Sequence, residues 1–383
     1  MAQLRILIAG GGTGGHIFPA LAVARALVDR HSADVLCVGT PRGLESRLIP
    51  EAGFSLKLID VGPLNSVSLL TRLRTLIALP GSIFACMRLI RQFKPDAVLG
   101  VGGYASGPAM AAALWMKIPT MAFEPNAMPG LANRLIGKRV QAAAVNFPAA
   151  AKWFRHIELT GVPVRAEFSS LRPPPAGPPH LLVFGGSQGA RILNTYVPRV
   201  VPALLDAVPG LTVLHQSGLR NFEVTEAAYT ASGADPARWQ VQPFLTAMAA
   251  EFGRAHLVVS RSGASTVGEE AAAGKPALLV PFALSADQHQ RRNAEAMQAA
   301  GAAVMLTEDD VEAPGRLLNT LKGLLTHPER LAAMSAAAHA QSHPGAAERI
   351  ADRLAELARA RETRSSESAR ERPGSSSRSK NLK

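Results

Sequence analysis

The sequence has few of the features that mark secreted, disulfide-bonded or membrane-spanning proteins. It contains only two cysteines, Cys37 and Cys86, in 383 residues. That is too few for a disulfide framework and is typical of a reduced, cytosolic protein. The N-terminus enters a short apolar strand directly, without the basic segment and apolar core of a secretory signal. The apolar run near 109–115 is shorter than the roughly 18 residues needed to cross a bilayer, so no spanning helix is expected.

Aromatic and acidic residues are also scarce. Aromatic side chains make up 5% of the chain, and 29 Asp and Glu stand against 41 Lys and Arg, for a net charge of +12. Seven basic and three acidic residues lie within 361–383, so +4 belongs to this tail and +8 to the rest. A basic body favours an anionic partner such as a phosphate or an acidic membrane surface. No RNA-reading motif or zinc-finger spacing accompanies the charge, so nucleic acid is not an expected partner.

What the chain does contain is an alternation of short apolar runs and helical patterns. In the first half the runs predict strands at Arg5–Ala9, Val35–Val38, Leu56–Ile59, Ala97–Val101, Thr120–Phe123 and Ala142–Val145. A proline-rich segment, 172–179, interrupts the pattern. The pattern then restarts with strands at His180–Phe184, Leu211–His215, Val241–Pro243, Leu257–Ser260, Ala277–Val280 and Ala303–Leu306. Strands that alternate with helices indicate a parallel sheet covered on both faces, once in each half.

These two halves set the expected domain boundaries. We expect one Rossmann-like domain over 1–161 and a second over 162–342, since the chain is long enough for two separate cores. A helix over 343–360 has apolar positions at helical spacing and is expected to pack back on the first domain. The basic tail, 361–383, is expected to be disordered. Near the N-terminus we expect a helix from about Phe18 to Arg30, with Pro19 in its first turn.

Three glycine-rich loops follow predicted strands: Gly10–His16, Gly102–Pro108 and Gly185–Arg191. Backbone N–H groups in such loops approach phosphates closely, and the dipole of the following helix adds attraction. Any one of these loops is as well explained by a tight turn between a strand and a helix. Three in one chain favour a diphosphate ligand on each side of a cleft. A nicotinamide cofactor fits less well, because the second strand ends Val38-Gly39-Thr40 without the acidic residue that binds its ribose.

Two further segments carry polar groups after strands. The strand near Ser260 leads into a helix near Ala264 whose N–H groups and hydroxyls suit a diphosphate, and Glu269 in the next turn suits a ribose. The alternative is a helix cap in which a serine or threonine pairs with a glutamate. The segment 281–290 carries amide and carboxylate groups suited to sugar hydroxyls, and its alternative is a polar loop that caps a helix from Arg291.

Five of these segments occur together in one order and spacing. Gly11–Pro19, Gly102–Pro108, Gly185–Asn194, Ser262–Glu270 and Asp287–Asn293 resemble the MurG family, bacterial glycosyltransferases that add N-acetylglucosamine to lipid I in peptidoglycan synthesis. The resemblance extends from about residue 4 to about residue 355. It implies an α/β fold of the GT-B type, with two Rossmann-like, doubly wound parallel-sheet domains facing a cleft. It also implies an inverting transfer from UDP-N-acetylglucosamine to lipid I, which yields lipid II and UDP.

The resemblance gives each domain and a set of residues a role. Domain 1–161 would face the acceptor and the membrane, and domain 162–342 would bind the UDP-sugar. The substrate-binding residues implied in the first domain are Thr13, Gly14 and Gly15 at the phosphates and Asn126 at the sugar, with Gly103, Tyr104 and Ser106 on the acceptor side. In the second domain they are Arg165 and Leu245 at the uracil, Ser187, Ala264, Ser265 and Thr266 at the diphosphate, Glu269 at the ribose and Gln290 at the N-acetylglucosamine hydroxyls. Val267 and Gly268 are also implied as substrate-binding residues. No cofactor or metal is expected, because a helix N-terminus can stabilise the departing UDP.

Two residues are candidates for the base that takes the proton of the attacking acceptor hydroxyl. His16 is the first, because it follows the first predicted strand and titrates near neutral pH. Its alternative is a helix-start histidine bonded to the backbone. Glu124 is the second. It lies in Phe123-Glu124-Pro125-Asn126, where the family commonly has His-Glu-Gln-Asn, so the roles of that histidine and glutamine do not carry over.

The segment Val67–Phe93 is the expected membrane contact. An apolar surface rimmed by arginine binds anionic headgroups without crossing the bilayer, which would place the protein at the cytoplasmic face of the inner membrane, near cell-wall and division proteins. The alternative is a core helix with a solvated basic face. The apolar residues of the expected membrane contact are Leu69, Leu70, Leu73, Leu76, Ile77, Leu79, Ile83 and Phe84, and its arginines are Arg72, Arg74, Arg88 and Arg91.

Other functions remain open on the sequence. One is a nicotinamide-dependent oxidoreductase, which the missing acid after the second strand disfavours. Another is a non-catalytic membrane adaptor, which has no need of three phosphate-type loops. The nearest alternatives are a related UDP-sugar transferase with another lipid acceptor and a nucleotide-sugar epimerase of the GT-B fold.

Overall fold

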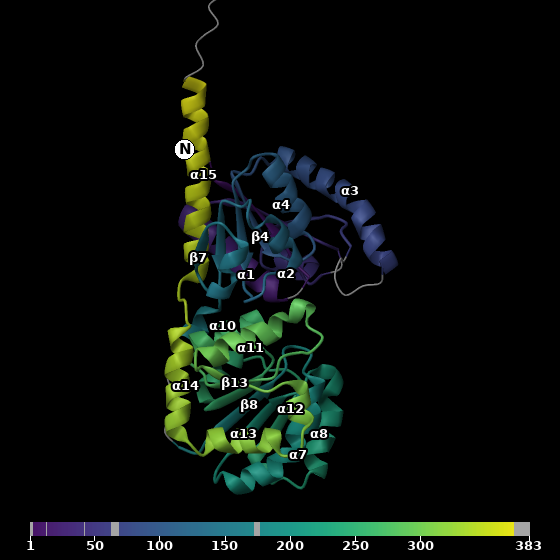
Figure 1. The fold of residues 1–383 in the computed structure, drawn as a ribbon, viewed down its shortest axis with the longest axis vertical. Helices are drawn as coiled ribbons and strands as arrows, with labels where there is room; N and C mark the ends of the chain where they lie inside the picture. The colour runs from purple at the N-terminus through teal and green to yellow at the C-terminus, as the bar shows by residue number, and fades with distance from the viewer. Residues whose placement is uncertain (1–2, 13, 42, 63–68, 172–176, 371–383) are drawn as a thin grey trace, which may run out of the picture.

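The computed structural model describes residues 3–12, 14–41, 43–62, 69–171 and 177–370. They form two α/β domains stacked end to end, each built on a parallel sheet (Figure 1). Several expected features lie outside the described residues: Thr13, part of the proline-rich segment (172–176), the first residues of the expected membrane contact (67–68) and the tail from 371 to 383.

The first sheet has seven strands in the order β3-β2-β1-β4-β5-β6-β7, all parallel. Six of them lie within one residue of predicted strands. The seventh, β7, has no predicted counterpart, because it is a three-residue edge strand whose Ile157 and Leu159 are 38% and 44% exposed, so that no apolar run marks it. The strands are β1 (Arg5–Gly10), β2 (Asp34–Gly39), β3 (Ser55–Leu58), β4 (Ala97–Gly102), β5 (Thr120–Glu124), β6 (Ala142–Val145) and β7 (Ile157–Leu159).

Helices cover both faces of this sheet. One face packs on α1 and the other on α3 and α4, each through its own apolar core. The helices of this domain are α1 (Gly14–His31), α2 (Glu45–Glu51), α3 (Leu69–Phe93), α4 (Ser106–Trp115), α5 (Leu131–Ile136) and the 3-10 helix η1 (Pro148–Trp153).

Helix α1 starts earlier than expected. It begins at Gly14, so the prediction that Pro19 lies in the first turn is wrong: Pro19 is buried inside the helix. A proline at this position has no N–H to donate to the carbonyl of Gly15. The helix therefore begins within the glycine loop itself, and its first turn lies at the carboxyl end of β1.

The second sheet has six parallel strands in the order β10-β9-β8-β11-β12-β13, all within two residues of predicted strands. They are β8 (His180–Phe184), β9 (Thr212–Gln216), β10 (Trp239–Gln242), β11 (Leu257–Ser260), β12 (Ala277–Leu279) and β13 (Ala303–Met305). The helices are α6 (Ala166–Ser169), α7 (Arg191–Ala207), η2 (Leu219–Asn221), α8 (Phe222–Ala231), η3 (Pro236–Arg238), α9 (Met248–Arg254), α10 (Ala264–Ala272), η4 (Ala286–Gln288), α11 (His289–Ala299), α12 (Glu308–Glu312), α13 (Arg316–Leu325) and α14 (Pro328–Ala340).

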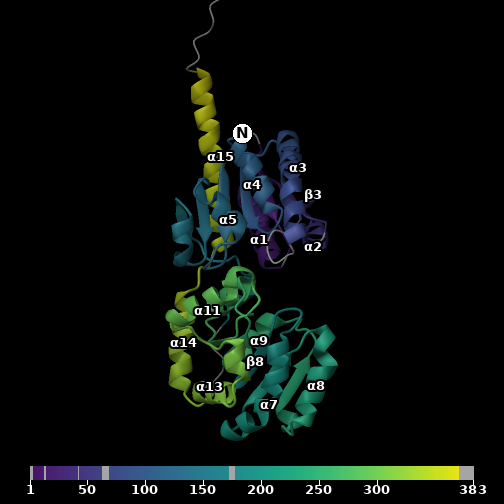
Figure 2. The ribbon, with the colours of Figure 1, turned by 45° about the vertical axis from the view of Figure 1, so that its right-hand side comes forward.

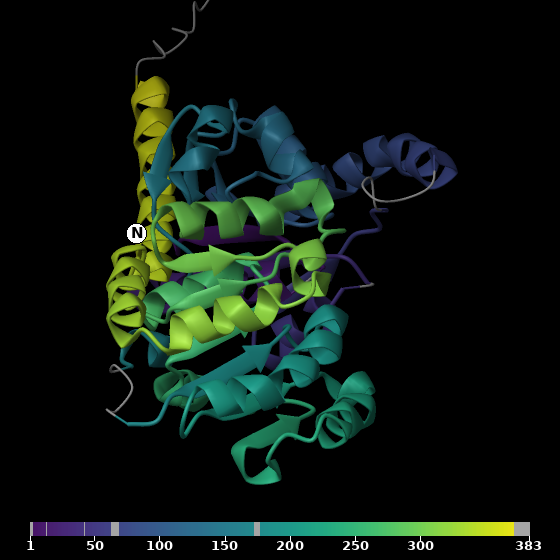
Figure 3. The same cartoon turned by 60° about the horizontal axis from the view of Figure 1, so that its bottom comes forward.

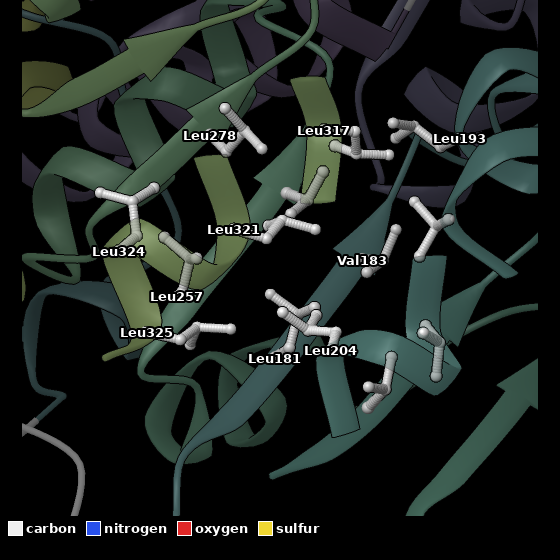
Figure 4. Packing of buried hydrophobic residues seen from close by; sticks show 14 of the residues in the cluster. Leu181, Val183, Leu193, Leu204, Leu257, Leu278, Leu317, Leu321, Leu324 and Leu325 are labelled. Carbon is white, nitrogen blue, oxygen red and sulfur yellow. The ribbon is translucent and has the colours of Figure 1, made fainter. Parts of the chain in front are cut away.

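The largest apolar core lies on one face of this second sheet. Leucines of α13 fit between the strands and α7, where Leu181 of β8 and Leu321 of α13 are both fully buried (Figure 4). Alternate residues of a strand point to opposite faces, and the neighbouring Leu182 accordingly packs in a different core with α9. Burial on both faces explains why the strands of this domain are continuous apolar runs.

The last helix, α15 (Ala346–Arg370), returns to the first domain. Its buried Ile350, Ala351 and Leu354 share a core with α1, β1 and β4. Figures 1 and 3 show α14 and α15 following one another along the same side of the two domains. The helix continues to Arg370, ten residues beyond the expected end at residue 360, while the expected disorder of the tail stays a prediction. The helix extends this far because the segment after Ala360 has few helix breakers before Pro373.

The two places where the chain crosses between domains touch one another. Arg349 donates to the Thr160 carbonyl (2.6 Å), and a Cβ on Gly161 would lie 2.3 Å from Cβ of His343. Helix α3 lies on the opposite side of the first domain from α15 (Figures 2 and 3). None of the helices in the described part of the chain combines the length and apolar character needed to cross a bilayer.

Candidate functional site

The strand orders bring the predicted loops together. In the first sheet the order reverses between β1 and β4, and in the second between β8 and β11. Ligands of open parallel sheets bind beyond the carboxyl ends of the strands at this point. The loops that follow these four strands are three glycine-rich loops and the segment from Arg261, so the topology places all four at the ligand-binding edges.

A cavity of about 750 Å³ lies between the two domains at these edges. Its walls come from both domains, with His16 and Asn126 on one side and the start of α10 on the other. The predicted site residues that line it are Gly15, His16, Asn126, Ala264, Ser265, Thr266 and Gln290.

The first glycine loop is tied to its surroundings by its own backbone. The N–H of Gly11 donates to the Gly102 carbonyl (3.3 Å), and the N–H of Gly12 donates to the Glu45 carboxylate (2.7 Å). These two donors are therefore engaged within the protein. The N–H groups of Gly14 and Gly15 lie in the first turn of α1, where backbone donors have no partner within the helix, so they are the candidates for a phosphate contact in this loop.

His16 lies in the first turn of α1 and lines the cavity. Its ring packs against Gly102, where a Cβ would lie 2.8 Å from Nε2. Burial and, to a smaller extent, the charge of His289 across the cleft lower the pKa of His16 to about 4, against the charge of Glu45, which acts to raise it. The imidazole is therefore neutral at pH 7 and able to accept a proton.

Glu124 sits behind the cavity rather than in its wall. Its side chain is 2% exposed. One carboxylate oxygen accepts from the N–H and side-chain amide of Asn126, and the other from the Gly130 N–H and the Asn133 amide, all at 3.0 or 3.1 Å. Burial raises the pKa of Glu124, against the effect of these donors. Since four donors occupy its two oxygens, the geometry makes Glu124 the support of the Asn126 loop and leaves His16 as the candidate base.

A buried asparagine joins the two domains beside Asn126. Asn293 of α11 is 0% exposed, accepts from the Ala127 N–H (2.9 Å), and donates to the Asn126 side chain (3.1 Å) and the Ser262 carbonyl (3.1 Å). Nearby, Arg134 of α5 pairs with Asp287 of η4 (2.7 Å). These contacts fix the candidate sugar-binding side of the cleft across the domain boundary.

The start of α10 is open towards the cavity. Its N-cap is Gly263, which has no side chain to cap the helix, so the alternative of a serine–glutamate cap is wrong. The first N–H groups therefore face the cavity at Ala264, Ser265 and Thr266. The next two predicted residues serve packing instead: Val267 is 1% exposed, and a Cβ on Gly268 would lie 3.2 Å from Val162.

The residues expected at the nucleoside lie outside the cavity lining. Arg165, the candidate uracil contact, forms an ion pair with Glu269, the candidate ribose contact (3.2 Å). Burial raises the pKa of Glu269, and the charge of Arg165 acts in the opposite direction. Leu245 is 6% exposed and packs in the core beside α9, which leaves its backbone to contact a ligand. Ser187, which was expected at the diphosphate, is exposed on the loop after β8.

The acceptor-side residues share the loop after β4. Gly103 packs on the first loop, where a Cβ would lie 2.1 Å from the Gly11 carbonyl oxygen. Tyr104 is 47% exposed, whereas Ser106 is fully buried at the start of α4. The structure thus brings the two loops of this domain together but does not bring Ser106 to the surface of the cleft.

Comparison with known proteins decides the family of this fold and site. Residues 6–145 match the model of the glycosyltransferase family 28 N-terminal domain, and residues 180–350 match that of the C-terminal domain. The chain belongs to glycosyltransferase family 28. Membership of this family excludes two alternatives that the sequence left open, a nicotinamide-dependent oxidoreductase and a non-catalytic membrane adaptor.

Curated relatives of this family 28 enzyme carry one name. The protein from Anaeromyxobacter sp. (strain Fw109-5) is 45% identical over 97% of both chains, and that from Myxococcus xanthus is 39% identical over 93% of both. Each is named UDP-N-acetylglucosamine–N-acetylmuramyl-(pentapeptide) pyrophosphoryl-undecaprenol N-acetylglucosamine transferase.

Solved structures agree with this assignment. The crystal structure of Acinetobacter baumannii MurG matches with a TM-score of 0.77 and 31% identity, over 92% of this chain and 99% of that one. The GT-B fold and the MurG resemblance expected from the sequence are thereby confirmed. The UDP-GlcNAc 2-epimerase of Neisseria meningitidis matches with a TM-score of 0.62 but 13% identity, which shows a shared fold alone.

The family 28 cleft also contains residues that the sequence did not single out. Arg261, directly after β11, pairs with Glu308 and lies over the Phe282 ring, with 5.2 Å from its guanidinium carbon to the ring centroid. His289 lines the cavity next to Gln290, and its Nδ1 lies 2.6 Å from the Ala286 carbonyl. The position of Arg261 after a predicted strand is a signal that could have identified it. Glu308 follows β13, which is also a predicted strand, so the same signal could have identified it.

Within the ranges that the structure describes, no three His, Cys, Asp or Glu side chains are arranged to bind a metal ion. The polar groups that line the cavity are instead N–H groups, hydroxyls, amides, arginines and imidazoles, together with the carboxylates of Glu308 and Glu312.

Proposed function

We infer that this family 28 enzyme transfers N-acetylglucosamine from UDP-N-acetylglucosamine to undecaprenyl-pyrophosphoryl-N-acetylmuramyl-pentapeptide, with release of UDP and formation of lipid II. The observation that carries this inference is the shared name of relatives that are 39–45% identical over nearly the whole chain. The cleft supports it, because phosphate-binding features stand on both sides of one cavity. An epimerase is not favoured, because its likeness extends to the fold alone.

In this proposal the second domain holds the donor. The N-terminus of α10 faces the diphosphate at Ala264–Thr266, and its dipole stabilises the negative charge that the departing UDP acquires. Glu269 and Arg165 bind the nucleoside, and Gln290 and Asn126 bind the sugar. Asn126 and Gln290 both line the cavity, from opposite domains, so the transferred sugar would lie at the domain boundary.

The first domain presents the acceptor and the base. The acceptor hydroxyl attacks the anomeric carbon from the face opposite UDP, its proton passes to Nε2 or Nδ1 of His16, and the configuration inverts. The low pKa of His16 before substrates bind suits a group that must be neutral before the reaction. An anionic acceptor diphosphate bound at Gly14 and Gly15 would raise that pKa and favour proton uptake.

We further propose that transfer needs no divalent metal and no cofactor. The α10 N-terminus supplies positive potential where UDP departs, which is the role that a metal plays in other transferases. The guanidinium of Arg261, held by Glu308, lines the same cavity and offers further N–H donors. This proposal predicts full activity with excess chelator present.

We also propose that α3 contacts an anionic membrane surface. Its Ile77 and Phe84 are 72% and 67% exposed, and Trp115, at the end of the neighbouring α4, is 79% exposed. Arg88 is exposed on the same helix. The side chains of Leu69, Leu70, Arg72, Leu73, Arg74 and Leu76 lie outside the described part, and Ile83 packs partly in the core. Such a contact would place the enzyme at the membrane that carries its lipid acceptor, beside cell-wall and division proteins.

One experiment tests donor, acceptor and metal together. Purified protein is mixed with UDP-N-acetylglucosamine and a short-chain lipid I analogue in EDTA, and UDP and the lipid product are followed. We expect UDP release that requires the analogue, with a β-linked disaccharide product. UDP release without a lipid product would refute this acceptor. Release only after magnesium is added would refute metal independence, and no release under either condition would refute the transfer.

A further inference from the structure

Glu45 is a buried carboxylate that the reaction as described does not use. It is the first residue of α2, and its side chain is 0% exposed. One oxygen accepts from the backbone N–H and the hydroxyl of Thr40 (2.9 and 2.8 Å), and the other accepts from the N–H of Gly12 (2.7 Å). A carboxylate held by three donors is a strong and well-directed acceptor. It therefore fixes the middle of the first glycine loop.

Glycines make the space that this carboxylate occupies. A Cβ on Gly11 would lie 2.4 Å from the Glu45 carboxyl carbon, one on Gly39 2.5 Å from its Cγ, and one on Gly43 1.9 Å from an oxygen. All three distances are far below an ordinary carbon contact. These glycines are needed for close packing around Glu45, a function separate from phosphate binding.

The second glycine loop holds the first loop from the other side. Gly11 donates to the Gly102 carbonyl, and Gly103 approaches the Gly11 carbonyl so closely that a Cβ there would lie 2.1 Å away. The His16 ring rests on Gly102. The loop that leads into His16 is thus held between Glu45 and the loop after β4.

The charge of Glu45 also acts on His16. Burial opposes ionisation of Glu45, but the N–H groups of Gly12 and Thr40 outweigh it, and the pKa of Glu45 lies below its usual value. Glu45 is therefore ionised at neutral pH. Two titratable groups influence His16 in opposite senses: His289, across the cleft, lowers its pKa, and Glu45 raises it.

We propose that Glu45 is a positioning residue for the transfer, whose buried negative charge fixes the Gly12 backbone and stabilises the imidazolium that His16 becomes when it takes the acceptor proton. This inference rests on the proposed function, in which His16 is the base. Glu45 does not line the cavity, so it acts through the loop and through its charge. Replacement by the neutral, equally large glutamine should therefore slow the reaction without weakening donor binding.

The test compares Glu45→Gln with wild type, with His16→Ala and with the control Glu51→Gln, whose carboxylate is exposed on the same helix. We expect Glu45→Gln to lower kcat about 10- to 100-fold, as for a misplaced catalytic group, with the KM for UDP-N-acetylglucosamine unchanged. We expect the acid limb of the kcat profile to move to lower pH by about 0.5 unit or more, because His16 loses an attractive charge. Glu51→Gln should match wild type.

A direct titration of the His16 imidazole by NMR provides a second readout that needs no turnover. Its pKa should be lower in Glu45→Gln than in wild type. If Glu45→Gln does not fold, Thr40→Val removes one hydroxyl donor and should lower kcat by about 5-fold. An unchanged kcat, or a lowered kcat with an unmoved acid limb and an unchanged His16 titration, would overturn the proposal. Two other results would refute the proposed function and not the role of Glu45: absence of transfer by the wild-type protein, or full activity of His16→Ala. In either case the NMR titration would still show whether Glu45 raises the pKa of His16.

Discussion

Single residues in this cleft differ in whether they contact substrate or support those that do. His16 and Asn126 line the cavity, whereas Glu124 and Asn293 lie behind them and are nearly or fully buried. Buried polar groups with all their partners in place define one arrangement of their neighbours, and loss of one partner leaves the others unsatisfied. The supporting residues should therefore be nearly as sensitive to substitution as the contacting ones.

Asn293→Ala tests this at the domain boundary. The substitution removes three hydrogen bonds and leaves the Ala127 N–H without its acceptor, which costs about 1–3 kcal/mol. We expect kcat/KM for UDP-N-acetylglucosamine to fall about 10- to 100-fold in steady-state kinetics. UDP should bind as in wild type by calorimetry, because the proposed nucleoside contacts are untouched. Asn319→Ala, at an exposed site of α13, is the control, and equal activity of the two variants would contradict the prediction.

At the scale of elements, two helices that pack on the first domain differ in how much apolar surface they bury. Helix α15 buries apolar residues against α1, and α3 keeps large apolar residues exposed on the other side of the sheet. The first arrangement stabilises the domain, whereas an exposed apolar surface on a helix of this kind marks an interaction site. The two helices should therefore respond differently to polar or truncating substitutions.

Leu354→Ala should destabilise the protein without affecting the chemistry. Leu354 is fully buried between α15 and α1, and loss of such a side chain costs about 2–5 kcal/mol. We expect a loss in this range in the free energy of unfolding, measured by denaturant titration, with kcat unchanged under native conditions. Glu356→Ala, on the exposed side of the same helix, should change stability by less than about 0.5 kcal/mol. A Leu354→Ala protein as stable as wild type would show that α15 does not stabilise the domain.

Ile77→Glu combined with Phe84→Glu should weaken membrane binding. Both side chains are largely exposed on α3, so the change adds charge to the proposed contact without disturbing the core. We expect co-flotation with vesicles of anionic phospholipid to be largely lost, while activity on a soluble short-chain acceptor is retained. Leu219→Glu places the same charge at a leucine of the second domain that is 79% exposed, and it should bind vesicles as wild type does. Equal binding by all three proteins would exclude α3 as the contact.

At the scale of the whole molecule, buried neutral histidines couple stability to pH. Burial lowers the pKa of His16 and His180 to about 4 and that of His215 to about 3. His215 lies between Tyr229 and Asn194, and each of its ring nitrogens is 3.0 Å from a partner. His16 lies in the first domain, and His180 and His215 lie on the neighbouring strands β8 and β9 of the second, three positions apart in register and with different hydrogen-bond partners. Their effects on unfolding should therefore add.

This coupling predicts an acid-sensitive fold. Between pH 6.5 and about 4 the unfolded chain binds protons at these histidines and the folded chain does not, so the free energy of unfolding falls as the pH is lowered. From about one pH unit above 6.5 the three groups are neutral in both states and contribute no slope. Urea titrations at pH 7.5, 6 and 5 should show this decline, and His215→Gln should reduce its steepness. A stability that stays constant from pH 7.5 to 5 would contradict the assignment.

The sequence alone determined the two-domain α/β architecture, the positions of twelve strands and the identity of the loops at the cleft. It could do so because parallel strands buried on both faces are unbroken apolar runs, and because glycine loops between strands and helices are local patterns. It missed β7, whose residues are too few and too exposed to form such a run, and it ended α15 too early.

Only the tertiary structure decided which residues share a space. It brought His16, Asn126, Ala264 and Gln290 to one cavity from both domains, and it placed Glu124 behind that cavity, bonded to the Asn126 loop. It also showed that Glu45, which no motif includes, holds the first glycine loop. Contacts between residues far apart in sequence depend on strand order and domain packing, and no local pattern specifies these.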